Sequence, residues 1–199
     1  MAITHDEATA QLHEWTASPA LRAHARGVEA AMRAAAHRYG DGAGDEARWA
    51  LTGLIHDADY DRWPDEHPHR VVAWLRERGE PEVAQAVLAH CDPSAVPELA
   101  PLDKALLACD ELTGFVMACC LVRPGGIRSL APSSVKKKLK DKGFAAKVSR
   151  DDVTQGAQRL GVPLDDHIQL VIDALAPHAD ALGLAGPRPA PASDDSPPA

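Results

Sequence analysis

Proline and glycine divide this chain of 199 residues into segments of helical length. The clearest breaks are Gly40–Gly44, Pro64 and the run Arg123-Pro124-Gly125-Gly126, because proline lacks the backbone N–H that a helix interior needs. Between the breaks, apolar residues recur at the 3.6-residue period of an α-helix, and no segment shows a convincing strand-like alternation. The sequence therefore predicts an all-α fold.

Capping signals set several helix ends. Thr4 with Glu7 forms the pattern of a capping box. Ser149 with Asp152 opens a later helix in the same way, and Pro177 is expected to kink or end the last one. The predicted helices cover residues 5–16, 18–40, 45–57, 67–78, 81–90, 101–122, 134–142, 149–161 and 164–182.

The length of the chain predicts one domain with a sizeable core, residues 1–184. The Pro/Ala-rich tail, residues 185–199, cannot bury a core and is expected to be disordered.

A net charge of −8 argues against binding to a nucleic-acid polymer. The chain has no signal-peptide pattern and no apolar run of bilayer length, so we expect a cytoplasmic protein that does not bind membranes. The sequence does not indicate an oligomeric state.

His56 and Asp57 form an adjacent pair where an apolar helix runs into an aspartate-rich loop. Neighbouring residues are about 100° apart on a helix, so only one can face the interior squarely. Both can still reach a metal seated at the C-terminal end of that helix. Imidazole nitrogen and carboxylate oxygen together suit divalent Mn, Fe, Co or Zn. The pair therefore predicts a metal site.

Other predicted helices place similar groups on apolar faces. His24, His90 and Asp110 each share a face with apolar residues, where an ionised carboxylate is costly unless it is paired or bound to metal. His67 is preferred to His69 because it continues a buried stripe. The six groups exceed the needs of one metal and could hold two, about 3.5–4 Å apart. The remaining histidines are expected on the surface: His5, His13, His37, His167 and His178.

The four cysteines are predicted to be buried, reduced thiols, since no C-x-x-C spacing occurs and Cys119 and Cys120 are adjacent. Cys91 and Cys109 flank the candidate ligands His90 and Asp110. Oxidation or a stray metal could therefore disturb the site.

The ordered set His24, His56-Asp57 and Asp110 resembles the metal-binding signature of the HD superfamily of metal-dependent phosphohydrolases. The resemblance implies an HD-domain helical bundle, here with additional C-terminal helices. It also implies that these four residues hold a divalent metal.

Two more histidines are similar to those that binuclear HD proteins add to this set. The resemblance implies that His67 and His90 serve a second metal and that Asp57 bridges the two, giving two divalent metals per chain. HD-GYP phosphodiesterases carry paired histidines near this point, whereas here Cys91 follows His90 and no Gly-Tyr-Pro motif follows. This departure argues against cleavage of cyclic di-GMP.

A closer resemblance, over residues 20–172, is to a group of small bacterial HD hydrolases. The matching segments are GLIHDADYD, Asp110-Glu111-Leu112-Thr113-Gly114, Leu121-Val122-Arg123-Pro124 and SVKKKLKDKGFAAKVSR. The group implies a fold and a metal site, but no particular substrate.

The resemblance favours hydrolysis of a phosphate ester in a nucleotide or a small phosphorylated metabolite. Metals would bind the phosphoryl oxygens and lower the pKa of a bound water toward about 7. Asp57 would act as the bridging ligand, and Asp61 or Asp59 could orient or deprotonate the water. An ordinary loop carboxylate is an equally good interpretation of Asp59 and Asp61.

A basic segment, residues 136–150, holds seven of the 21 basic residues. Lys138 and Lys142, one helical turn apart, and Arg150 are candidates to hold phosphate, with Lys142 also placed in the catalytic set. Arg123 is a further candidate, because a guanidinium grips phosphate with two hydrogen bonds. A solvated helix face is the alternative interpretation of the segment.

Two other functions remain open. Some HD-fold proteins, such as myo-inositol oxygenase and the phosphonate-cleaving oxygenases, use the same six-ligand pattern to hold a di-iron centre that activates O₂. The residues here allow that equally, and the substrate would then be an anionic small molecule, such as a phosphonate, or a polyol-like one. The third possibility is a degenerate HD module that binds nucleotide or a protein partner without catalysis, although no ligand position is missing.

Overall fold

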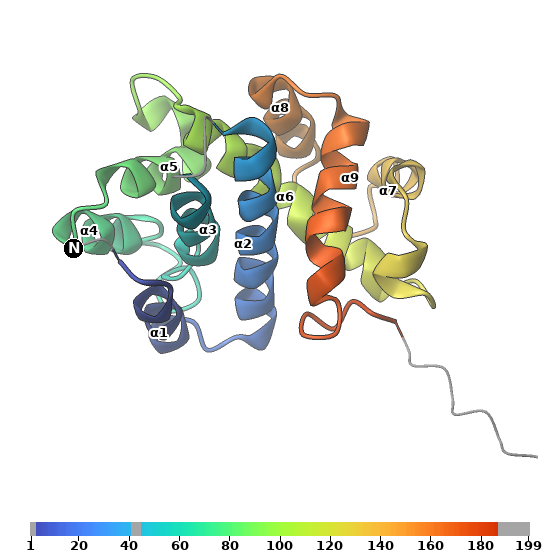
Figure 1. The fold of residues 1–199 in the computed structure, drawn as a ribbon, viewed down its shortest axis with the longest axis horizontal. Coiled ribbons are helices and arrows are strands. Elements are labelled where there is room, and N and C mark those ends of the chain that lie inside the picture. The colour runs from blue at the N-terminus through green and yellow to red at the C-terminus, as the bar shows by residue number, and fades with distance from the viewer. Residues whose placement is uncertain (1–2, 41–44, 187–199) are drawn as a thin grey trace, which may run out of the picture.

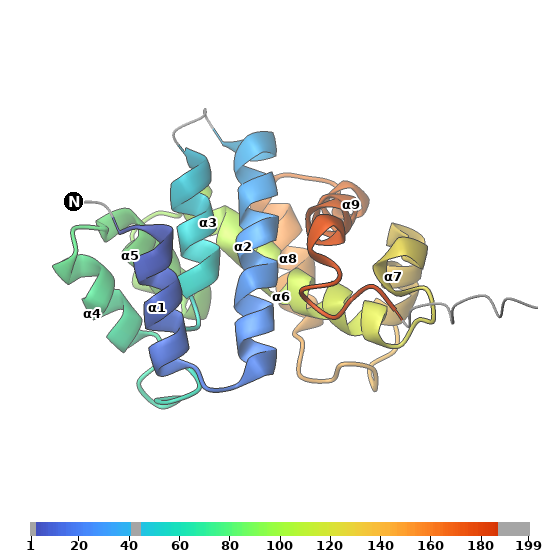
Figure 2. The same ribbon diagram turned by 60° about the horizontal axis from the view of Figure 1, so that its bottom comes forward.

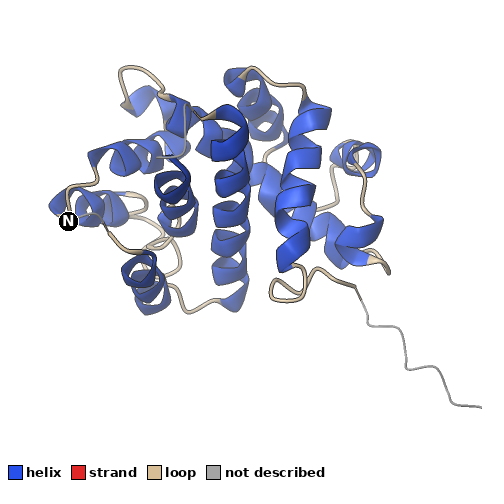
Figure 3. Ribbon diagram, viewed as in Figure 1, coloured by secondary structure: helices blue, strands red, loops and turns tan. Residues whose placement is uncertain are grey.

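Helices make up the structure, a computed structural model that describes residues 3–40 and 45–186 (Figure 1). Within these residues there are nine α-helices and three short 3₁₀ helices, and no strand (Figure 3). The α-helices are α1 (His5–Trp15), α2 (Pro19–Tyr39), α3 (Asp45–Ile55), α4 (His69–Glu77), α5 (Pro81–Cys91), α6 (Pro101–Leu121), α7 (Pro132–Leu139), α8 (Arg150–Leu160) and α9 (Leu164–Leu175). The 3₁₀ helices are η1 (Pro93–Ala95), η2 (Gly126–Ser129) and η3 (Ala176–His178). The predicted all-α fold is confirmed.

The predicted caps form their hydrogen bonds. The N–H of Glu7 donates to Thr4 Oγ1 at 3.2 Å, and the N–H of Thr4 donates to Glu7 Oε2 at 2.8 Å, which completes the capping box of α1. The N–H of Asp152 donates to Ser149 Oγ at 3.2 Å and so caps α8. Gly161 ends α8 with a left-handed φ of 75°.

Proline shortens two of the predicted helices. α4 begins at His69 rather than at His67, because Pro68 disfavours the helical conformation of the residue before it. α9 ends at Leu175 rather than near residue 182, because Pro177 cannot continue the helix and lies in a 3₁₀ turn. His67 is therefore held in a connection rather than on a helix.

The central helix α2 has α3 along one side and α9 along the other (Figures 1 and 2). α1, α4 and α5 lie beyond α3, where they share one apolar cluster. α7 lies at the opposite end of the molecule from α4. α6 joins the two halves, since it packs against α5 and α2 as well as α8 and α9. The candidate ligands lie where α2, α3, α5 and α6 meet.

Gly53 allows α3 to touch α2. A Cβ at this position would lie 2.7 Å from the carbonyl oxygen of Val28 and 2.8 Å from the nitrogen of Glu29. Both are backbone atoms of α2 and cannot move aside as a side chain can. Val28 lies one turn beyond His24, and Gly53 lies three residues before His56. This contact therefore fixes how closely the two histidines approach.

Packing runs slightly past the predicted domain boundary. The N–H of Ile127 donates to the carbonyl of Leu184 at 2.9 Å, and Ala185 packs against the core. These contacts hold the start of the predicted tail against η2. The rest of that tail, residues 187–199, lies outside the described residues, as does the predicted glycine loop at 41–44. The single domain over residues 1–184 stays a prediction. No helix in the described ranges is both long and apolar enough to cross a bilayer.

Candidate metal centre

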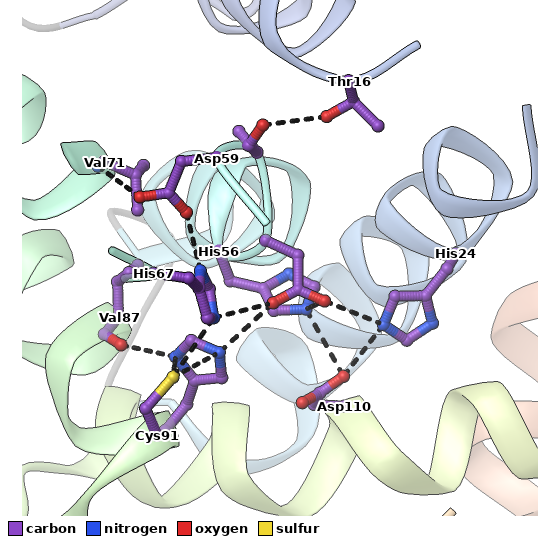
Figure 4. A network of polar contacts seen from close by, with 12 residues as sticks. Thr16, His24, His56, Asp59, His67, Val71, Val87, Cys91 and Asp110 are labelled. Atoms are coloured by element: carbon purple, nitrogen blue, oxygen red, sulfur yellow. Dashed lines mark hydrogen bonds and ion pairs between the residues drawn. The ribbon is translucent and has the colours of Figure 1, made fainter. Parts of the chain in front are cut away.

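The structure brings all six predicted ligands together, although they come from distant parts of the chain. α3 ends at Ile55, so the His56-Asp57 pair lies in the turn that follows it, where both side chains reach the same space. The other ligands are His24 on α2, His67 before α4, His90 on α5 and Asp110 on α6. Figure 4 shows His24 and Asp110 on one side of His56, with His67 and Cys91 on the other.

We call the group formed by His24, His56 and Asp110 the first position. Asp110 Oδ1 lies 2.9 Å from His24 Nε2 and 3.3 Å from His56 Nε2. Asp57 Oδ2 faces the same two nitrogens, at 3.9 Å and 3.4 Å respectively. Two imidazole nitrogens and two carboxylate oxygens thus surround one point.

We call the group formed by His67 and His90 the second position. Asp57 Oδ1 lies 3.3 Å from His67 Nε2 and 3.4 Å from His90 Nε2. The two oxygens of Asp57 therefore face different positions, Oδ2 the first and Oδ1 the second. This is the arrangement expected of a carboxylate that bridges two ions.

Hydrogen bonds at the far side of each ring aim the Nε2 atoms into the cluster. His56 Nδ1–H donates to the Gly53 carbonyl at 2.8 Å, and His90 Nδ1–H donates to the Val87 carbonyl. The Nε2 of His56 is buried and has no hydrogen-bond partner. A buried polar atom without a partner is costly, and a cation bound at the first position would satisfy it. These residues therefore fit a divalent metal.

Asp59 orients His67 from behind. It is buried, its Oδ1 accepts from His67 Nδ1–H at 2.6 Å, and its Oδ2 accepts from the N–H of Val71 at 2.9 Å. The sequence suggested that Asp59 could act on the water. The structure gives both of its oxygens other partners, so it is a positioning residue for the second position.

Asp59→Asn should weaken metal binding at the second position alone. An amide cannot accept from both His67 and Val71, so the ring loses its fixed orientation. We expect the affinity of that position to fall about 10–100-fold, as is typical when a ligand loses its hydrogen-bond partner. Calorimetric titration of metal-stripped protein measures this, with the first position as the internal control. Equal weakening of both positions would contradict the assignment.

Histidines and carboxylates in the cluster shift one another's pKa. Burial lowers the pKa of His56, but Asp57 and Asp110 outweigh it and raise that pKa well above its usual value. The pKa of His67 rises to about 9 and that of His90 to about 10, because bonds to Asp59 and Asp57 respectively outweigh burial. Without metal, these rings hold protons at neutral pH, and metal binding must release them.

Asp61 lies away from the cluster. Its Oδ2 accepts from the backbone N–H groups of Ala17 at 2.7 Å and Ser18 at 2.9 Å, so it holds the connection between α1 and α2. The catalytic role suggested by the sequence finds no support in these contacts. The ordinary loop carboxylate is the interpretation that fits.

Two arginines predicted to hold phosphate make hydrogen bonds to nearby loops. The Arg150 guanidinium donates to carbonyl groups between residues 141 and 148, which closes the loop before α8. Arg123 donates to the carbonyl of Ser129 at 2.7 Å and to its Oγ at 3.3 Å. The carbonyl groups of these short loops accept hydrogen bonds from the two guanidinium groups. Such bonds cannot be predicted from the sequence alone.

The two predicted phosphate-binding lysines do not share a helix face. α7 ends at Leu139, because Asp141 Oδ1 accepts from the N–H of Gly143 at 3.2 Å and forms a turn. Lys138 lies over the ring of Phe144 and 3.5 Å from Asp141 Oδ2. Lys142 is exposed and lines a cavity of about 380 Å³ together with Ser149 and Arg150. Its role in substrate binding stays a prediction.

Three residues near the cluster were not predicted to act there. Glu111 follows Asp110 on α6 and accepts from the N–H of Ser149 at 3.1 Å; burial raises its pKa to about 7. The exposed ring of Tyr60 meets the His67 ring edge-on at 5.4 Å. Cys91 Sγ lies 3.2 Å from His67 Nε2. Tyr60 and Glu111 lie in segments that resemble the small bacterial HD hydrolases, but their spacing in the sequence does not indicate a role at the site.

Two predictions about burial are wrong. His167 is buried rather than at the surface, and its Nε2–H donates to the carbonyl of Ala108 at 3.0 Å. It shares a face of α9 with Val171 and Leu175, which are also buried. Cys91 is exposed rather than buried, because it is the last residue of α5. The other three cysteines are buried, and the remaining histidines predicted at the surface are exposed.

Residues 21–114 match the family model of the HD domain, and all six candidate ligands fall inside this segment. Residues 21–114 of this chain belong to the HD superfamily. HD domains bind divalent metals and form a superfamily of metal-dependent hydrolases, and the cluster of histidines and aspartates in this chain could hold such a metal. The helices after residue 114, including α7 to α9, lie outside the match. Comparisons with curated proteins and with solved structures found no significant match.

Proposed function

We propose that this HD protein is a phosphohydrolase that uses two divalent metals to cleave a phosphate ester of a nucleotide or small phosphorylated metabolite. The observation that carries the proposal is the placement of Asp57, whose two oxygens face separate pairs of imidazole nitrogens at 3.3–3.9 Å. Bound divalent metals supply charge that neutralises phosphoryl oxygens and lowers the pKa of a water.

The residues of the chain divide the work of holding these ions. His24, His56 and Asp110 would hold the first and His67 and His90 the second, with Asp57 shared. Side chains supply no more than four donors at each position, so an ion that takes five or six ligands keeps places for water and substrate.

We also propose that an anionic part of the substrate is contacted near Ser149, next to Glu111. Ser149 bonds to Glu111 and also lines the cavity that holds Lys142. This bond connects the end of the basic segment to the helix that carries Asp110. We therefore keep Lys142 as a candidate to contact an anionic substrate, and we do not assign that role to Arg150 or Arg123.

Phosphate release by reconstituted protein tests the reaction. Metal-stripped chain is loaded separately with Mn²⁺, Co²⁺, Zn²⁺ or Fe²⁺ and supplied with nucleotides, sugar phosphates and a chromogenic phosphate ester. We expect metal-dependent release that His56→Ala abolishes, because that variant removes a buried ligand. His69→Ala is the matched control and should retain activity, since His69 is exposed.

The same preparations distinguish the other functions. Oxygen consumption by the iron-loaded protein, without phosphate release, would favour the oxygenase. Tight nucleotide binding without turnover in any metal form would favour the non-catalytic module. Either result would refute the proposed reaction.

A further inference from the structure

Cys91 lies against the two imidazoles of the second position (Figure 4). Its Sγ is 3.2 Å from His67 Nε2 and 3.5 Å from His90 Nε2. The three other cysteines are buried in the apolar core, whereas Cys91 is exposed. Cys91 is thus the one thiol in the described structure that meets candidate metal ligands in this way.

Hydrogen bonds fix the far side of each ring and leave both Nε2 atoms facing Cys91 and Asp57. His67 Nδ1 is bonded to Asp59, and His90 Nδ1 is bonded to the Val87 carbonyl. His90 Nε2 also lies within hydrogen-bond distance of Asp57 Oδ1, at 3.4 Å. A cation bound here would replace any proton on the two nitrogens and would accept lone pairs from both of them and from a thiolate at once.

Four distances between the donor atoms match those around a tetrahedral ion. Zinc bonds of about 2.0–2.2 Å to nitrogen or oxygen and about 2.3 Å to sulfur place neighbouring donors about 3.3–3.6 Å apart. Sγ lies 3.2 Å and 3.5 Å from the two nitrogens, which lie 3.3 Å and 3.4 Å from Asp57 Oδ1. Two nitrogens, one oxygen and one sulfur therefore form a four-donor set.

We propose that Cys91 Sγ is the fourth donor of the second position and that this position takes an ion that favours thiolate, such as Zn²⁺ or Co²⁺. The inference rests on the two metal positions proposed above, but not on the reaction. On binding, the S–H bond breaks, a sulfur–metal bond forms and the proton passes to solvent. The first position has only nitrogen and oxygen donors, so it does not share this preference.

Anaerobic titration of the metal-stripped full chain with Co²⁺ tests this proposal. We expect a thiolate-to-cobalt charge-transfer band in the near ultraviolet as the second position fills, and its loss in Cys91→Ser. His67→Ala should also lose the band while still binding cobalt at the first position. His69→Ala is the matched control and should keep it. Bound cobalt without a band, or a band that persists in Cys91→Ser, overturns the proposal.

Alkylation of the folded protein gives an independent readout. Iodoacetamide should react at Cys91 alone, because the other thiols are buried. We expect Zn²⁺ or Co²⁺ to slow this reaction, as measured by mass spectrometry, and an unchanged rate in metal-saturated protein would contradict the inference. Neither measurement uses turnover. A protein that shows the band but hydrolyses no phosphate ester would keep this inference and refute the proposed reaction.

Discussion

Asp57→Asn should remove metal from both positions and abolish phosphate release. The substitution takes away the carboxylate that faces the Nε2 atoms of both His67 and His90, and one of the two that face His24 and His56. Among the six candidate ligands, Asp110 would then be the remaining carboxylate. Metal affinity should fall by more than the factor of about 10–100 that is typical when a metal ligand loses its hydrogen-bond partner. Elemental analysis after dialysis reports metals per chain, and phosphate release reports activity.

Asp61→Asn is the matched control, with the same change of charge four residues along the chain. Asp61 bonds to Ala17 and Ser18 rather than to the cluster. We expect this variant to keep its metals and activity and to lose about 0.5–1.5 kcal/mol of unfolding free energy for a weakened hydrogen bond. Retention of two metals by Asp57→Asn would refute the bridging role.

The helices were predictable because their signals are local. The capping box at Thr4 and Glu7 and the Ser149 cap each act within four residues, and both formed as expected. The ligand set was predictable for a different reason. Charged or polar groups such as Asp110 interrupt apolar helix faces. Burying such a group costs free energy unless it is paired or bound to metal.

Contacts between distant segments were not predictable. Asp59 precedes Val71 by twelve residues, and nothing in the intervening sequence indicates that its oxygens meet this backbone and the His67 ring. Arg150 resembles a phosphate ligand in sequence, yet loop carbonyls use its donors. Cys91 was expected in the core because cysteine usually is. Its place at the end of α5 turns it toward the second position instead.

Gly53→Ala should damage the first position from a distance. Its Cβ would lie 2.7 Å from the Val28 carbonyl oxygen, so α3 must move away from α2. Overpacking of this kind typically costs about 1–3 kcal/mol, or roughly 2–4 °C in unfolding midpoint per kcal/mol for a chain of this length. The same movement separates His24 from His56, so metal affinity at the first position should fall as well. Denaturation of metal-free protein and metal titration measure the two effects separately.

Gly114→Ala is the matched control for Gly53→Ala, because it adds the same methyl group to another helix, beside His24. A Cβ at Gly114 would meet only the His24 ring, at 3.6 Å, which is ordinary contact. Alanine also favours a helix over glycine by up to about 1 kcal/mol, and this gain applies equally to both variants. Gly114→Ala should therefore be as stable as the parent or more so, with metal binding unchanged. Similar behaviour of the two variants would show that the contact between α2 and α3 does not set the geometry of the first position. A loss confined to Gly53→Ala would show that the approach of two backbones, rather than the ligands alone, determines whether His24 and His56 can share one ion.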